Sequence, residues 1–286
     1  MKTSKKKASR LLNKDTLCRT LIFCVLFLTA LVFIIPLLIT VFAAFKTPMQ
    51  LGAESPLIPP KQLYLENFET AFVDGQILLG FKNSLLLVLC SVAINVVLGT
   101  MAAYAIGRFD FKFKKLITGI FMLGLILPSN LTEIPRFITL TKLGVYNSLA
   151  APIIIYAATD MIQLSMYLQF INRIPKSLDE SARIDGCTYF GVFTKIILPL
   201  MKPAIATMAI IKVVWVVNDM YVPYLYMPSS QLRTLTTTLM NFSSTRQGTW
   251  NNLSAAIILV ALPTLLLYIF FQKYIFSGIV AGAVKE

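Results

Sequence analysis

The most restrictive feature of this 286-residue sequence is a set of long apolar runs that contain no charged residue. A helix that crosses a membrane needs about 20 apolar residues in a row, because hydrocarbon offers the backbone no hydrogen-bonding partner. The charge-free runs are 21–45, 83–107, 116–132 and 253–272. Two further apolar stretches, 147–172 and 204–226, contain charges. The sequence therefore predicts an all-α integral membrane protein with six transmembrane helices.

Composition and charge support this fold class. Hydrophobic residues make up 57% of the chain, and its mean hydropathy is +0.74. Most of the 26 Lys and Arg residues fall on one side of the predicted spans, which places both the N and the C terminus in the cytoplasm. The formal net charge of +13 then reflects contact with anionic lipid, and no nucleic-acid partner is expected.

This topology divides the chain into three parts. We expect residues 1–20 to form a cytoplasmic N-terminal tail, 21–276 a six-helix transmembrane domain, and 277–286 a cytoplasmic C-terminal tail. Within the domain, the loop 173–203 is polar, charged and patterned as helix. We expect a helix over 178–185 with a capping box of Ser177 and Glu180 after Pro175. Gly186 would end it in a left-handed C-cap, giving a rigid knob that suits docking into another protein.

The loop resembles the EAA loop of bacterial ABC importer permeases. The resemblance rests on Glu180-Ser181-Ala182, then Asp185-Gly186, then Ile196 with Leu198-Pro199; only Ser181 departs from the triplet, where the family usually has Ala. In that family the loop is a coupling helix that inserts into a cleft of a cytoplasmic ATPase subunit. The resemblance thus implies ATPase-coupling roles for Glu180, Ser181, Ala182, Asp185, Gly186, Leu198 and Pro199.

Further matches are similar to one branch of this family, the carbohydrate permeases of the maltose and multiple-sugar type. They include Phe45-Lys46-Thr47, Arg108-Phe109, Ile134-Pro135, Asn218-Asp219 and Gln272-Lys273. Departures are Val217, where a Trp is frequent, and Glu286, where Gly is usual. The resemblance implies a type I ABC importer permease fold in the bacterial cytoplasmic (inner) membrane. Implied partners are a second, different permease subunit, two cytoplasmic ATPase subunits and an extracytoplasmic solute-binding protein.

The sequence lacks the residues that several kinds of catalytic and nucleotide-binding site need. The chain has no His, and none of its 13 Gly is followed by Lys, so imidazole catalysis and a Walker A nucleotide loop are excluded. We therefore expect a transport subunit that is not an enzyme, with no metal site and no cofactor of its own. ATP and Mg would be bound by the partner ATPase subunits, whose closure would be coupled to alternating access.

Ionisable residues inside spans are costly and face a cavity or a partner. Asp160, Lys212 and Asp219 meet this description, and Trp215 and Asn218 share their region. We interpret these five as candidates for the translocation pathway, with Asp160 pairing with Lys212. The alternative is a buried ion pair that only fixes helix register, with Trp215 as a packing residue. At the level of function, the alternatives are an ABC permease for a peptide or polyamine, or an ion-coupled secondary carrier.

Overall fold

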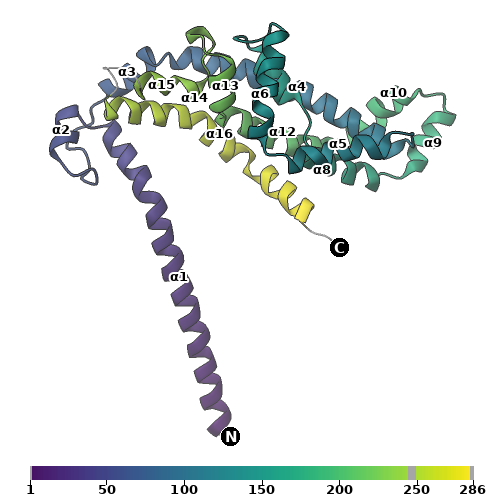
Figure 1. The fold of residues 1–286 in the computed structure, drawn as a ribbon. Helices are drawn as coiled ribbons and strands as arrows, with labels where there is room; N and C mark the ends of the chain where they lie inside the picture. The colour runs from purple at the N-terminus through teal and green to yellow at the C-terminus, as the bar shows by residue number, and fades with distance from the viewer. Residues whose placement is uncertain (1, 244–248, 284–286) are drawn as a thin grey trace. The chain divides into compact units, whose positions relative to one another are not determined.

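The computed structural model describes the backbone of residues 2–243 and 249–283, and side chains within 16–128, 131–242 and 249–272. All regular elements in these described residues are helical, as predicted. In chain order they are α1 (Lys2–Ala44), α2 (Pro48–Ala53), α3 (Glu66–Asp74), α4 (Ile77–Arg108), α5 (Lys114–Ile126), α6 (Ser129–Lys142), α7 (Ala150–Ala157), α8 (Met161–Arg173), α9 (Lys176–Ile184), α10 (Tyr189–Val192), η1 (Phe193–Ile197), α11 (Leu198–Leu200), α12 (Lys202–Asn218), α13 (Tyr221–Tyr226), η2 (Ser230–Leu232), α14 (Leu235–Thr238), α15 (Met240–Ser243) and α16 (Trp250–Ala283) (Figure 1).

Three described helices are long and apolar enough to cross a membrane alone: Thr16–Ala44 of α1, Ile77–Arg108, and Trp250–Gln272 of α16. Three further candidates are helix pairs bent by more than 40° at a short break. These pairs are α5 with α6, α7 with α8, and the stretch Tyr189–Leu200 with α12. If each bent pair counts as one span, the described residues hold six, in agreement with the predicted number.

Two of the bends correct the expectation of continuous third and fourth spans, and each of these has a local cause. Pro128 stands at the start of α6, where its missing N–H cannot continue the preceding helix. Asp160 ends the α7–α8 break, because its side chain caps α8 by accepting a bond from the Gln163 N–H at 2.8 Å. The predicted fifth span, 204–226, is wrong as a single helix, since α12 ends at Asn218 and α13 begins at Tyr221.

The chain divides into two compact units, residues 1–74 with 242–259 and residues 75–241 with 260–286. The predicted tail 1–20 is continuous with helix α1, which begins at Lys2. The predicted tail 277–286 falls partly in α16, and residues 284–286 lie outside the described residues.

The first unit is organised around Lys46, which is fully buried. Its ammonium donates to the backbone oxygen of Ser55 at 3.1 Å. Its own backbone oxygen accepts bonds from the side-chain amides of Asn67, at 2.8 Å, and Asn251. These bonds fix the turn that follows α1, because a buried carbonyl left without a donor would be costly.

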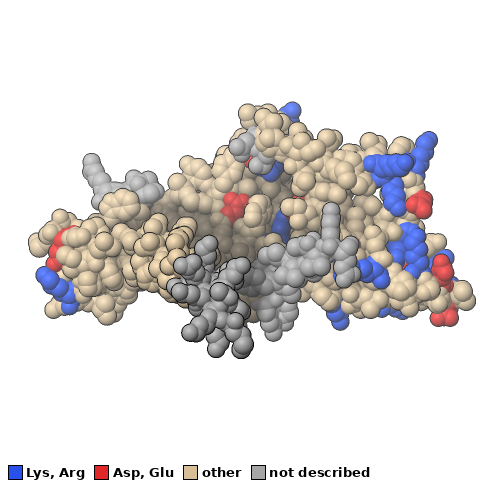
Figure 2. All heavy atoms as spheres, turned by 90° about the horizontal axis from the view of Figure 1, so that it is seen from below, with Lys and Arg blue, Asp and Glu red and all other residues tan. Residues whose placement is uncertain are grey.

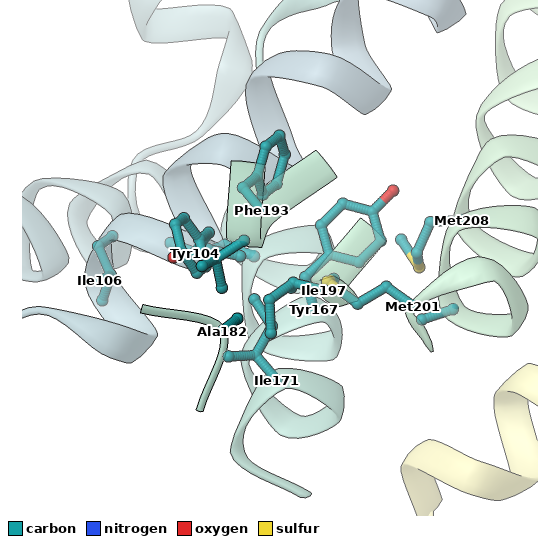
Figure 3. Close-up of a cluster of buried hydrophobic side chains, with 13 residues drawn as sticks. Tyr104, Ile106, Tyr167, Ile171, Ala182, Phe193, Ile197, Met201 and Met208 are labelled. Carbon is teal, nitrogen blue, oxygen red and sulfur yellow. The ribbon is translucent and has the colours of Figure 1, made fainter. Parts of the chain in front are cut away.

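The second unit is built on α4, which packs against α7, α8, α12 and α14. One end of α4 enters a buried cluster that we call the loop cluster, drawn in Figure 3: Ala103, Tyr104, Ile106, Leu164, Tyr167, Ile171, Ala182, Val192, Phe193, Ile197, Met201, Ala204 and Met208. The other part of α4 contributes Leu87 and Val88 to a second cluster with Tyr156, Val216 and Tyr226. A single helix thus joins the packing around the 173–203 loop to the packing at the far end of α12.

Candidate functional site

The predicted coupling helix forms as α9, but its start differs from the expectation. It begins at Lys176, directly after Pro175, and no side chain caps its first turn. The predicted capping box of Ser177 and Glu180 is therefore wrong, because Ser177 lies inside the first turn instead of at its boundary. The helix itself, Lys176–Ile184, lies within two residues of the predicted range.

The two faces of α9 have different environments. Glu180 and Ser181 are exposed, whereas Ala182 is 7% exposed and packs in the loop cluster. Figure 3 shows Ala182 among side chains of α8 and α4, near Ile171 and Tyr104. The small side chain of Ala182 thus fastens α9 to the membrane helices, while the acidic and hydroxyl side chains point outward.

The end of α9 has the predicted glycine corner. Gly186 has φ +86°, and no atom lies within 4 Å of the position where a Cβ would stand, so backbone conformation alone favours glycine here. The N–H of Gly186 donates to the Arg183 oxygen at 3.1 Å, and the N–H of Cys187 donates to the Ala182 oxygen at 2.9 Å. These are the two bonds of a Schellman motif. Asp185, the C-cap residue, is exposed.

The Leu198-Pro199 pair lies where the loop re-enters the membrane helices. Leu198 packs against the loop cluster, and Pro199 is exposed. The turn before Pro199 is a π-helix, Phe193–Ile197, in which the N–H of Leu198 donates to the Phe193 oxygen. The wider turn accommodates a residue that has no N–H of its own to donate. The chain then bends by 75° into α12.

An ion pair between Arg108 and Asp179, which the sequence did not reveal, ties α9 to the end of α4. The Nε of Arg108 lies 2.9 Å from Oδ2 of Asp179, and the two side chains are 5% and 17% exposed. The same guanidinium donates to the backbone oxygen of Ile174 at 2.8 Å. Burial raises the pKa of Asp179 above its usual value, and the guanidinium of Arg108 offsets part of that rise.

Positive charge gathers where α9 lies. Figure 2 shows Lys and Arg side chains concentrated at the end of the second unit that carries α9 and α10 in Figure 1. The exposed basic residues of this region include Lys112, Arg173, Lys176, Arg183 and Lys195. This arrangement agrees with the charge bias from which the cytoplasmic side was predicted.

The five predicted pathway residues do not form one group. Asp160 caps α8, and no ion pair within 4.0 Å joins it to Lys212 in the described part of the chain, so the predicted pairing is not formed. The Nζ of Lys212 instead lies 5.1 Å from the centre of the Trp215 ring. Asp219 accepts a bond from the hydroxyl of Tyr156 at 2.8 Å.

Three of those residues, Trp215, Asn218 and Asp219, line a cavity of about 490 Å³ in the second unit. Sequence reasoning missed two charged residues in its wall, Glu133 and Arg136 of α6. They lay beyond the predicted third span, which ended at residue 132. Their opposite charges three residues apart on a helix were a signal that could have found them.

Comparison with known proteins agrees with this architecture. Residues 95–280 match the family described as the binding-protein-dependent transport system inner membrane component. The chain is 30% identical over 259 residues, 90% of its length and 92% of the relative's, to the arabinooligosaccharides transport system permease protein AraQ of Halalkalibacterium halodurans. It is 29% identical, over 79% of its length and 83% of the relative's, to the melibiose/raffinose/stachyose import permease protein MelC of Bacillus subtilis.

Among solved structures, a subunit of a bacterial ABC transporter that imports the acidic polysaccharide alginate has the same fold. Its TM-score is 0.80 at 17% identity, over 91% of this chain and 97% of that one. Three findings point to the same family: the helical spans, the loop built on α9 and the family match over residues 95–280. This chain belongs to the family of inner membrane components of binding-protein-dependent transport systems, and it is a permease subunit of an ABC importer.

Proposed function

We propose that this chain is a permease subunit of an ATP-driven importer that takes up a sugar or oligosaccharide from a solute-binding protein in the bacterial cytoplasmic membrane. Relatives that match most of its length carry the names of arabinooligosaccharide and of melibiose, raffinose and stachyose permeases. A second permease subunit and two cytoplasmic ATPase subunits would complete the transporter. ATP and Mg would be held by the ATPases, since no Gly of this chain is followed by the Lys of a Walker A loop.

The observation that carries the proposal is the construction of α9. Its outer face presents Glu180 and Ser181, and its inner face is fixed by Ala182. Asp179 holds its first turn to α4, and the corner at Gly186 fixes its exit. A helix held at both ends and exposed on one side can transmit a push without bending, which is what coupling to an ATPase requires.

The roles proposed for the loop follow from these positions. Glu180 and Asp185 would hydrogen-bond at the rim of the ATPase cleft, and Ser181 would allow close approach because its side chain is small. Leu198 and Pro199 would pass the movement of the loop to α12. When ATP closes the two ATPase subunits, the loop would move with them and the helices would turn the pathway outward.

An ion-coupled carrier is a weaker explanation. Such a carrier needs carboxylates that are free to bind and release a cation. Asp160 is engaged as the cap of α8, and Asp219 accepts a bond from Tyr156 and two more from backbone N–H groups after α12. Both carboxylates therefore have structural roles at helix ends.

The proposal is tested by purifying the tagged chain from its native membrane and identifying its companions by mass spectrometry. We expect a second permease and an ATPase with the wild type, and loss of the ATPase from Glu180→Lys. Glu69→Lys is the matched control, because Glu69 is also an exposed acidic residue on a helix, α3. A wild-type protein that is purified alone and transports without ATP in liposomes would overturn the proposal.

A further inference from the structure

The cavity of about 490 Å³ has the size of a small-molecule site, since such sites span about 300–1,000 Å³. Helices α6, α7, α12 and α13 supply its wall, all within the second unit. Its polar and aromatic lining consists of Glu133, Arg136, Trp215, Asn218, Asp219 and Tyr221. Three ionisable side chains in the wall of one cavity of a membrane protein, Glu133, Arg136 and Asp219, need a chemical explanation, because such groups are costly there.

The carboxylate of Glu133 is held in place by two donors. The hydroxyl of Tyr226, a fully buried residue, donates to Oε1 at 2.7 Å, and Arg136 donates to Oε2. Arg136 is 30% exposed, and its buried Nε has no hydrogen-bond partner in the described structure. The pair is therefore neutral as a whole, and the exposed part of the guanidinium keeps N–H donors beyond the one that Glu133 accepts.

The carboxylate of Asp219, the residue that follows α12, is also fixed by hydrogen-bond donors. The hydroxyl of Tyr156 donates to Oδ2 at 2.8 Å, and the N–H groups of Tyr221 and Val222 donate to Oδ1 at 2.8 and 3.3 Å. Three donors spread its charge; Oδ1 already accepts two of these bonds, and Oδ2 can accept one more. The cavity thus offers hydrogen-bonding groups in fixed positions without an unbalanced cation.

The ring of Trp215 supplies the apolar surface of the cavity. It is 54% exposed, although an indole usually contributes its area to packing. Its orientation is set by an edge-to-face contact with Tyr156, with ring centres 5.6 Å apart and planes at 84°. The neighbouring side chain of Asn218 is exposed as well, and its amide donates to the Val214 oxygen at 2.8 Å.

We propose that this cavity binds one unit of a neutral oligosaccharide, an inference that rests on the proposed function. A sugar ring combines an apolar C–H face, which fits the exposed indole of Trp215, with hydroxyls that both donate and accept. The carboxylate of Glu133 and Oδ2 of Asp219 accept from such hydroxyls, and an N–H of the partly exposed Arg136 guanidinium donates to them. An anionic sugar gains nothing here, because the guanidinium is already paired with Glu133.

The position of the cavity suits this role. Helix α12 begins at Lys202, beside the loop, and ends at Asn218, which lines the cavity. Its 17 residues make it about 25 Å long, close to the thickness of the hydrocarbon core. The site therefore lies at the end of α12 away from α9, which under the proposed function is the side where the solute arrives.

The test uses the assembled transporter in liposomes with its binding protein. Raffinose, maltotriose, arabinotriose and an alginate trisaccharide are first screened for ATP-driven uptake, and the imported neutral sugar becomes the probe. In a chain with Cys18, Cys24, Cys90 and Cys187 replaced by Ser, Asn218→Cys is labelled with a maleimide with and without the probe. Gln231→Cys, at another exposed residue of the second unit that does not line the cavity, is the control.

We expect the probe to slow labelling of Asn218→Cys at least fivefold and to leave Gln231→Cys unchanged. Trp215→Ala should raise the KM for uptake by roughly three- to tenfold, the range that loss of an aromatic contact predicts. Trp215→Phe should restore most of the affinity, and kcat should change less than KM. A variant that only failed to fold would lose kcat as well, and Trp215→Phe would have no selective effect on KM.

Two results would overturn the inference while leaving the proposed function intact. One is ATP-driven uptake of a neutral sugar without any protection of Asn218→Cys. The other is protection by the alginate trisaccharide as strong as that by the neutral sugar. If the screen finds ATP-driven uptake of no carbohydrate, the proposed substrate class fails first, and the inference falls with it.

Discussion

Arg108, the last residue of α4, lies 2.9 Å from the carboxylate of Asp179 in the first turn of α9. The contact joins the longest helix of the second unit to the loop that we propose as the ATPase-docking element. Both side chains are largely buried, so the pair is shielded from the solvent that weakens surface ion pairs.

Replacing Arg108 by Gln should leave the buried Asp179 carboxylate without its counter-charge and cost roughly 1–3 kcal/mol of stability. It should also lower the number of solute molecules imported per ATP hydrolysed, because α9 is no longer held to α4. Thermal unfolding in detergent and coupled uptake assays measure the two effects. The double variant with Asp179→Asn should lose less than the sum of the single variants. Additive losses would show that the contact has no energetic coupling.

The same pair predicts a pH dependence. The pKa of Asp179 is raised in the folded protein, mainly by burial, so the native state holds this proton to higher pH than the unfolded chain. Stability therefore falls as pH rises from the usual Asp range through the raised pKa. Because Arg108 lowers this pKa, Arg108→Gln should steepen the fall and extend it to higher pH. Asp179→Asn should abolish the added slope in unfolding measured across that range.

Gly186→Ala tests the corner of the coupling loop. An Ala in this left-handed conformation costs roughly 1–2 kcal/mol, although no neighbouring atom obstructs its Cβ. Gly144→Ala is a matched control, because Gly144 has φ +72° and equally open surroundings between α6 and α7. Both variants should lose similar stability, and only Gly186→Ala should lose the ATPase on purification. Loss of the ATPase from both would indicate general destabilisation.

Ala182 lies on the buried face of α9 and Ser181 on its exposed face, so variants at the two positions test the two faces separately. Ala182→Leu should overfill the loop cluster and cost roughly 1–3 kcal/mol, whereas Ser181→Leu at an exposed position should change stability by less than about 0.5 kcal/mol. Affinity for the ATPase should show the opposite order, because Ser181 faces outward. Unfolding and pull-down measurements on both variants test this. Equal stability losses would contradict the burial of Ala182.

Asp160→Ala should destabilise the protein by about 1 kcal/mol through loss of the α8 cap, and Asp160→Asn should restore most of it. The amide oxygen of Asn still accepts from the Gln163 N–H but carries no charge. If Asp160→Asn were as damaging as Asp160→Ala in unfolding assays, charge and not capping would be the role of this residue. That result would support the ion pair with Lys212 that the sequence predicted.

Local sequence patterns predicted two features correctly. The runs of apolar residues predicted the number of spans. Gly186 predicted the corner after α9, because few other residues adopt its backbone conformation. The start of α9 was less certain from sequence, since Ser177 and Pro175 offer competing signals for the same boundary. In the structure Pro175 marks the boundary, and α9 begins at the next residue.

Contacts between distant residues were beyond what local patterns could show. Four helices, α5 to α8, lie between Arg108 and Asp179 in sequence, and Glu133 accepts a bond from Tyr226, which follows it by more than 90 residues. The capping role of Asp160 was missed because a charge within an apolar stretch fits a mid-span residue and a helix cap equally well in sequence. Only the break between α7 and α8 distinguishes them.

That break has a mechanical consequence. Asn95 of α4 donates to the backbone oxygen of Ala158 at 2.8 Å and accepts from the amide of Gln163 at 2.7 Å, so it supplies partners to groups that the interrupted helix exposes. About 20 Å of unbroken helix separates Asn95 from Arg108. Helix α4 is thus bonded to the α7–α8 break through Asn95 and to α9 through Arg108. Under the proposed function, a movement of α9 would act on α4 at Arg108 and, through this rigid stretch of helix, on the break at Asn95.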